Sequence, residues 1–199
     1  MIFFTSDLHL GHEKSISFTN RPFSDVEQMN SALIDNINQT VGERDELWVL
    51  GDFAFKIDMQ QVRELRKRIK CRHLHLVKGN HDKDYSKESV FESVQDYKQL
   101  KTDYGVFILF HYPILEWNRA HYGSVHLHGH IHSTGCYNEE NLKKKFSDRF
   151  TYKHSSKIED LGLRIYDVGV DANDYRPISL EKIAQLMNLK RIRGNTDGE

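Results

Sequence analysis

The sequence predicts an α/β fold in which short buried strands alternate with helices. Six short apolar runs, rich in β-branched, aromatic and leucine residues, have the length and composition of strands. The segments between the early runs carry apolar residues at helical spacing. The later runs follow one another with less helix between them, which indicates a mixed sheet rather than a purely parallel one.

The boundaries of the elements follow from these patterns. The predicted strands are Ile2–Thr5, Glu46–Leu50, His73–Val77, Val106–Phe110, Val125–Leu127 and Leu163–Val168. The predicted helices cover residues 26–41, 62–69 and 183–187. Ser24 and Glu27 have the spacing of a capping box for the first helix, and Ser179 is the expected N-cap of the last one.

A chain of 199 residues fits one domain. No internal repeat and no Pro/Ser-rich linker divides it, so we expect a single domain over residues 1–192. A polar stretch at 137–157 interrupts the succession of strands, and we predict that it is a mobile functional flap. The polar tail at 193–199 is expected to fray.

Composition excludes several classes of protein. Lys and Arg number 28 against 29 for Asp and Glu, so no basic excess is present to hold a long polyanion. No apolar run is long enough to cross a bilayer, and the N-terminus lacks the pattern of a signal peptide. Cys71 and Cys136 cannot form a disulfide framework. These features predict a cytoplasmic protein that acts neither on a membrane nor on a long nucleic acid.

Polar residues follow five of the predicted strands. In order, they are Asp7-Leu8-His9, Gly51-Asp52, Gly79-Asn80-His81-Asp82, His111 and Gly129-His130-Ile131-His132. Ligands of α/β sheets bind beyond the carboxyl ends of strands, so five strands deliver Asp, Asn or His to that edge. Residues two apart on an extended segment point to the same side. Asp7 with His9, and His130 with His132, can therefore converge on one place.

These residue types predict a metal site. Imidazole and carboxylate groups without thiolates suit Mn, Fe or Zn. The set holds more ligands than one ion needs, and Asp52 is the natural carboxylate to bridge two ions. Four further histidines alternate with leucines along strands and are expected to form only the polar face of half-buried strands: His73, His75, His126 and His128.

The five blocks, in this order, resemble the signature blocks of the calcineurin-like metallophosphoesterase superfamily. The surrounding segments, such as Ser6 to His12 and Val168 to Asp171, resemble a small prokaryotic and phage-associated branch. The resemblance implies a four-layer α/β/β/α sandwich of two mixed sheets flanked by helices. It places Asp7, His9 and His132 on one metal ion and Asn80, His111 and His130 on the other, with Asp52 bridging.

The resemblance implies that His81 is no ligand but faces the substrate. His81 would protonate the leaving group or stabilise charge in the transition state, and Asp82 would orient its ring; a plain turn residue is the alternative for His81. Many relatives carry a further Asp shortly after the Gly-Asp pair, where this chain has Phe53-Ala54-Phe55. That departure bears on the class of substrate rather than on the metal site.

Four residues are candidates for substrate binding. His12 is either a substrate contact or an exposed loop residue, and Arg21 either holds a phosphate or is solvated. Trp117 and Asn118 follow the His111 block closely and either line the pocket, with the aromatic ring stacked on a base, or only pack. Asp171 is expected to be a turn residue rather than a ligand of a third metal.

Together these observations predict a dinuclear metal-dependent phosphoesterase. Two divalent ions would activate a bridging hydroxide that attacks a small phosphodiester or nucleotide-type phosphoester. Mn is the expected metal, and Fe, Zn and Ni are the alternatives. A metal-dependent nuclease or phosphomonoesterase is the alternative activity. A non-catalytic scaffold of the same fold is the alternative class of protein. The presence of all the expected metal-binding residues in every block argues against a scaffold. The expected partner is a small phosphoester substrate, and the oligomeric state is left open.

Overall fold

The computed structural model describes residues 1–144 and 164–192 and contains two mixed sheets. The first has the order β4-β3-β2-β1-β9, in which only β9 pairs antiparallel. The second has the order β5-β6-β7-β8, in which only β5 pairs antiparallel. The strands are β1 (Ile2–Thr5), β2 (Glu46–Val49), β3 (His73–Val77), β4 (Ser93–Gln95), β5 (Lys98–Thr102), β6 (Gly105–Leu109), β7 (Val125–His128), β8 (Ile165–Asp167) and β9 (Ile178–Ser179).

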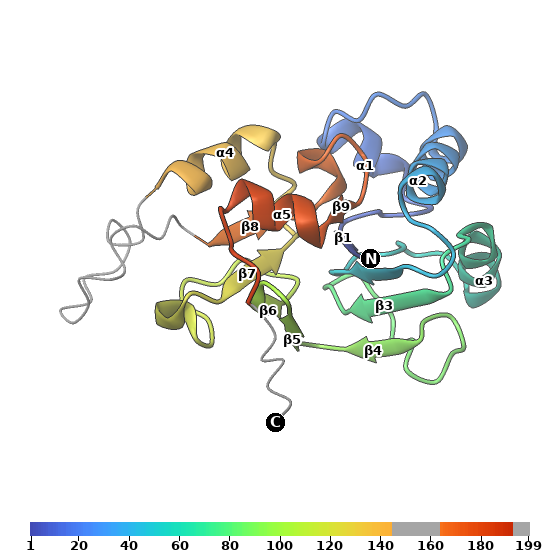
Figure 1. Cartoon of the computed structure of the whole chain (residues 1–199). Coiled ribbons are helices and arrows are strands. Elements are labelled where there is room, and N and C mark those ends of the chain that lie inside the picture. Colours follow the sequence, from blue (N-terminus) through green and yellow to red (C-terminus); the bar gives the residue numbers. More distant parts are fainter. Residues whose placement is uncertain (145–163, 193–199) are drawn as a thin grey trace.

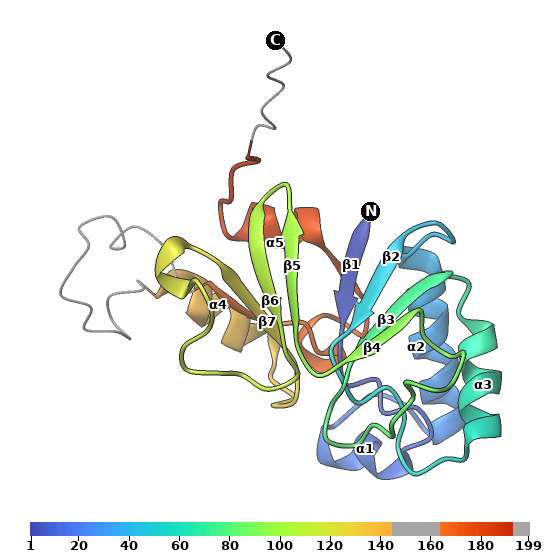
Figure 2. The same ribbon diagram turned by 90° about the horizontal axis from the view of Figure 1, so that it is seen from below.

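Helices pack against the two sheets. They are α1 (Glu13–Phe18), α2 (Val26–Thr40), α3 (Met59–Arg68), α4 (Gly135–Lys143) and α5 (Leu180–Leu186), with 3-10 turns η1 (Ala120–Tyr122) and η3 (Val170–Ala172). Helix α5 contributes Leu180 and Ile183 to the cluster between the sheets. Figure 1 shows α2 and α3 beside the first sheet and α4 beside β8 of the second. Figure 2, turned by 90°, shows the sheets as neighbouring layers with α2 and α3 on the outside. The predicted sandwich of two mixed sheets flanked by helices is confirmed.

Alternation along each strand divides the apolar core into layers. Phe3, on one face of β1, packs in the cluster formed with α2 and α3. Phe4, on the other face, packs between the sheets against Phe107 of β6, with ring centroids 6.4 Å apart. A smaller cluster around Ile108 and Trp117 covers the outer face of the second sheet. The first sheet is therefore covered by two long helices and the second by shorter segments.

Helices α3 and α5 each begin three residues before the predicted start, and one of the two predicted N-caps is shifted. The N-cap of α2 is Asp25, not Ser24, because the Asp25 carboxylate accepts from Gln28 N at 2.8 Å while Gln28 Oε1 accepts from Ser24 N at 2.6 Å. The prediction for α5 is confirmed, since Ser179 Oγ accepts from Lys182 N at 3.1 Å. After this one-residue shift, side-chain oxygens still accept hydrogen bonds from free backbone N–H groups at the start of α2.

The predicted flap at 137–157 is wrong for the part that the structure describes. Residues up to Lys143 belong to α4, and Asn138 is buried, donating from Nδ2 to the Asp167 carbonyl at 2.9 Å and accepting from Asp167 N at 2.8 Å. These two bonds fasten α4 to β8. The rest of the stretch lies outside the described residues, as does the tail at 193–199.

Short and edge elements were not predicted. β5 has the polar sequence KQLKT, typical of an edge strand protected by lysines, and β9 has only two residues. The single-domain boundaries remain a prediction. Within residues 1–144 and 164–192, no helix has the length and apolar character needed to span a membrane.

Candidate metal centre

All seven predicted ligands follow strands at one edge of the two sheets. By strand they are Asp7 and His9 after β1, Asp52 after β2, Asn80 after β3, His111 after β6, and His130 and His132 after β7. These strands run parallel within each sheet, so their carboxyl ends share an edge. Asp7, Asp52 and His111 are buried, whereas Asn80 is exposed. The site thus has a buried floor and an open rim.

One half of the cluster consists of Asp7, His9 and His132. The Nε2 atoms of His9 and His132 lie 3.3 Å apart, and His132 Nε2 lies 4.0 Å from Asp7 Oδ1. One ligand atom of each residue is within 4.8 Å of the others. The structure therefore brings together the three residues that the resemblance assigns to one metal ion.

The other half is arranged around Asp52. Its Oδ2 atom lies 3.5 Å from His9 Nε2 and 3.6 Å from His111 Nε2, so Asp52 stands between the two halves. His111 Nε2 is also 3.0 Å from Asn80 Oδ1. The ring centroids of His130 and His111 are 5.0 Å apart. The second set of predicted ligands is therefore clustered as well.

Buried polar atoms of the cluster lack the partners that such groups normally have. Asp7 Oδ1 and His9 Nδ1 have no hydrogen-bond partner among the described residues, which is costly in a buried site. Burial raises the pKa of Asp7 to about 7, and burial together with His132 lowers the pKa of His9 to about 2. A neutral imidazole offers its lone pair to a cation, and a nearby cation favours an ionised carboxylate. The residues therefore fit divalent metal ions.

Hydrogen bonds behind two of the imidazoles orient them. His111 Nδ1 lies 2.8 Å from the Leu50 carbonyl oxygen, and His132 Nδ1 lies 2.7 Å from Asp171 Oδ2. Nδ1–H donates in each pair, which leaves Nε2 directed at the cluster. Burial opposes charge on His132, but the Asp171 hydrogen bond and the Asp7 carboxylate outweigh it and raise the pKa of His132.

The backbone of the ligand loops is strained. Five of the seven residues have φ between 45° and 73°: Asp7, His9, Asp52, His130 and His132. This left-handed region is unfavourable for residues with a side chain, and such residues concentrate at functional sites. Gly51, with φ of 98°, permits a close approach, because a Cβ there would lie 2.2 Å from His111 Nδ1.

Asp82 has a different task from the predicted one of orienting the His81 ring. Its carboxylate accepts three backbone N–H bonds, from Asp52 N at 2.8 Å, Phe53 N at 2.9 Å and Gly79 N at 2.8 Å. Burial raises the pKa of Asp82 to about 6 against these bonds. Asp82 thus joins the loop after β2 to the loop after β3 and positions Asp52 and Asn80.

The prediction that Arg21 binds substrate is wrong. Its guanidinium is buried and pairs with both carboxylate oxygens of Asp171 at 2.9 Å. It also donates to the carbonyl oxygens of Asp7 at 2.7 Å and Leu8 at 3.1 Å. Asp171 is therefore more than a turn residue, because it connects Arg21 to His132. A spacing of 150 residues gave no local signal of this pairing.

Trp117 and Asn118 also lie away from the cluster. Trp117 is 5% exposed, donates from Nε1 to the Ser124 carbonyl at 3.2 Å and packs in the cluster around Ile108. Asn118 donates from Nδ2 to Gln99 Oε1 on the edge strand β5 at 2.7 Å. Closeness in sequence to His111 was misleading, because this connection folds over the outer face of the second sheet.

An aromatic rim lies beside the cluster. The rings of His12 and Phe55 are stacked at 3.8 Å, and His12 lies 5.4 Å from His9. Phe18 is 56% exposed and contacts both His12 and His132. His81 is exposed and stands edge-on to Phe55 at 4.8 Å. Phe18 and Phe55 were not singled out from the sequence, although Phe55 follows the Gly51-Asp52 block closely.

Two mixed sheets with clustered Asp, Asn and His side chains at one edge define a candidate metalloprotein of the α/β sandwich class. Residues 1–146 match the model of the calcineurin-like phosphoesterase superfamily domain. The chain therefore belongs to this superfamily, whose members are generally hydrolytic phosphoesterases that use divalent metals.

Two relatives and one solved structure are similar to the chain over different shares of its length. An uncharacterized protein of Methanocaldococcus jannaschii, MJ1445, is 29% identical over 192 residues, which are 96% of this chain and 93% of the relative. The Gene 66 protein of Mycobacterium phage L5 is 28% identical over 166 residues, covering 65% of this chain and 76% of the phage protein. The structure of AQ665 from Aquifex aeolicus, a protein of unknown function, aligns with a TM-score of 0.67 at 23% identity, over 94% and 98% of the chains. The AQ665 likeness supports the fold.

Proposed function

We propose that this protein is a dinuclear metal-dependent phosphoesterase that hydrolyses a small phosphodiester or nucleotide-type phosphoester. The position of Asp52 carries the proposal, since one carboxylate oxygen lies within 3.6 Å of an imidazole Nε2 from each sheet. A carboxylate so placed can serve two cations at once. A single-ion site would need only one of the two halves.

The proposed ligands are those of the resemblance. Asp7, His9 and His132 would hold one ion and Asn80, His111 and His130 the other, with Asp52 shared. When bound, the ions would supply positive charge for the phosphate oxygens and lower the pKa of a water molecule. Mn²⁺ is the first candidate because hard oxygen ligands and imidazoles make up the set, and Fe, Zn and Ni are the alternatives.

His81 is the proposed proton donor to the leaving oxygen. Its backbone N–H donates to Asp52 Oδ1 at 2.9 Å, which keeps the residue at the edge of the cluster. Its ring is exposed and lies 5.5 Å from that of His9. A side chain that reaches the cluster without being buried in it can approach a leaving group on the solvent side.

The aromatic rim supports a nucleotide-type substrate. Phe18 and the stacked pair of His12 and Phe55 lie beside His9 and His132. A base or another flat leaving group could stack on the exposed face of Phe18 while its phosphate reaches the ions. The substrate-binding role of His12 is part of this proposal. A cytoplasmic location, expected from the unpaired cysteines, stays a prediction.

A hydrolysis panel in Mn²⁺-supplemented buffer tests the proposal. It compares an aryl phosphodiester, an aryl phosphomonoester, a cyclic nucleotide and single-stranded DNA. We expect turnover of small esters with two Mn²⁺ bound per chain, loss of turnover with EDTA, and recovery when metal returns. Cleavage confined to DNA, with strong dependence on salt, would favour the nuclease. Full metal loading without turnover of any substrate would favour the non-catalytic scaffold.

A further inference from the structure

A second concave site lies at the far end of the second sheet from the metal centre. The described residues enclose a pocket of about 510 Å³ there, a size suited to a small ligand. Gly105 and Val106 begin β6, and Ser124 precedes β7, whereas the candidate ligands His111 and His130 follow the opposite ends of these strands. At about 3.3 Å per residue, the five residues of β6 separate the two sites by roughly 17 Å.

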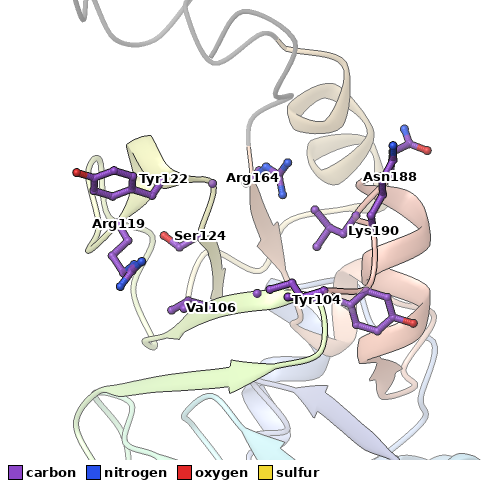
Figure 3. Close-up of a pocket in the computed structure, with 12 residues that line it drawn as sticks. Tyr104, Val106, Arg119, Tyr122, Ser124, Arg164, Asn188 and Lys190 are labelled. Carbon is purple, nitrogen blue, oxygen red and sulfur yellow. The ribbon is translucent and has the colours of Figure 1, made fainter. Parts of the chain in front are cut away.

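The lining of this pocket is cationic. Arg119, Arg164 and Lys190 contribute to it, and none of the twelve described residues that line it is acidic. Figure 3 shows Arg164 above the pocket, Val106 on the opposite side, and Arg119 and Lys190 at its two ends. The protein as a whole carries a formal net charge of −1. Three cations around one hollow are therefore a local feature, and they favour an anionic ligand.

Arg164 gives a second, independent indication that the pocket binds an anion. Its Nε atom is buried and has no hydrogen-bond partner among the described residues. Burial lowers the pKa of Arg164. A guanidinium group donates through five N–H groups and is costly to bury without acceptors. A phosphate in the pocket would supply acceptors to the guanidinium group of Arg164, since Arg forms paired N–H···O bonds with phosphate.

Two tyrosines complete the site. Tyr122, which is 75% exposed, has Arg119 over its ring at 5.7 Å, and Tyr104 has Arg191 over its ring at 5.5 Å. Figure 3 places Tyr122 and Tyr104 at opposite ends of the pocket. The chain segment that carries Lys190 is fastened beside Tyr104, because Ile192 N donates to the Asp103 carbonyl at 2.7 Å. Each end thus carries a tyrosine ring and a cation, with Arg164 between the ends, which suits a ligand with both a base and a phosphate.

We propose that this pocket binds a nucleoside phosphate, separately from the metal centre. Arg164 and Lys190 would hold the phosphate, and a tyrosine ring would stack with the base. None of these residues belongs to the proposed catalytic machinery, so binding should not require metal.

Calorimetric titration of the full chain with AMP, inorganic phosphate and adenosine tests the proposal, each in Mn²⁺ and in EDTA. We expect saturable AMP binding that persists in EDTA, weaker binding of phosphate and weakest binding of adenosine. Lys190→Gln should weaken AMP binding in EDTA by about 10-fold and Arg164→Gln by about 10–100-fold, from the loss of a charged hydrogen bond. Lys67→Gln, which removes an exposed cation from α3, is the matched control and should change nothing.

Three results would overturn the proposal. The first is the absence of saturable AMP binding by the wild type in EDTA. The second is phosphate binding as tight as that of AMP, which would mean that the pocket does not recognise the base. The third is AMP affinity that is unchanged in Arg119→Gln and Lys190→Gln. Both of these side chains are exposed, so the two variants keep the test decisive even if replacing the half-buried Arg164 prevents folding.

Discussion

The two sheets contribute different kinds of side chain to the candidate metal centre. The first sheet delivers both carboxylates, the amide and one imidazole, through Asp7, Asp52, Asn80 and His9. The second delivers only imidazoles, from the loops after β6 and β7. The first sheet is covered by α2 and α3, whereas short segments around Trp117 cover the outer face of the second. Neither sheet alone holds the full set of proposed ligands, so the proposed centre depends on how the sheets are joined.

The largest expected effect comes from removing the carboxylate between the two halves. Asp52→Ala should abolish turnover and reduce bound metal, because one side chain would serve both ions. Metal analysis of purified wild type and variant, combined with rates on an aryl diester, checks this. Asp58→Ala, at the N-cap of α3, is a control that should retain the metal. Equal metal content and turnover in Asp52→Ala and wild type would mean that the sheets do not share a dinuclear centre.

A variant of His81, which follows β3 of the first sheet, distinguishes proton donation from metal binding. His81→Ala should keep its metals but lose roughly 10²–10⁴-fold in turnover on substrates with basic leaving groups, the usual contribution of a general acid. With an activated aryl leaving group the loss should shrink markedly. The exposed His73 on β3 offers a control in His73→Ala.

Two other outcomes for His81→Ala are informative. An equal loss on both leaving groups with metals retained would assign His81 to charge stabilisation in the transition state alone. Loss of the metals would show that His81 is a ligand.

Asp171 tests how the second sheet holds His132. Asp171→Asn should weaken metal binding by about 10–100-fold, because the hydrogen bond behind His132 changes. It should also lower the free energy of unfolding by about 3–5 kcal/mol, because the buried Arg21 guanidinium loses its anion. Metal titration and urea unfolding measure the two effects, with the exposed Asp174→Asn as control. Unchanged metal affinity would contradict the role assigned to Asp171.

The smallest effects on catalysis are expected on the outer face of the second sheet. Trp117→Ala should lower stability by about 3–5 kcal/mol through the loss of a buried aromatic ring, while kcat/KM per folded molecule stays unchanged. Asn118→Ala, at an exposed position, should change stability by no more than about 0.5 kcal/mol. Urea unfolding and steady-state kinetics check both variants. A raised KM in either variant would indicate that the replaced residue does bind substrate.

The sequence was most informative where a residue's role depends on its place at a strand end. Asp7, Asp52 and His111 each follow an apolar run, and the direction of parallel strands alone brings such residues to one edge. Arg21 and Trp117 were misassigned because their roles depend on the direction of a side chain and on distant partners. The same holds for Asp82, whose three backbone N–H partners are invisible in a pattern of residue types.

The pairing of Arg21 with Asp171 also has a consequence for the order of events during synthesis. The two residues are 150 positions apart, so at ordinary elongation rates Asp171 emerges from the ribosome roughly 8–30 s after Arg21. Until then the nascent chain exposes β1 to β3 and several candidate ligands without the carboxylate that neutralises Arg21 and orients His132. Loading of the proposed metal centre would therefore come late in synthesis, after Asp171 has emerged, and the unfinished site is the stage at which a wrong metal ion would be captured.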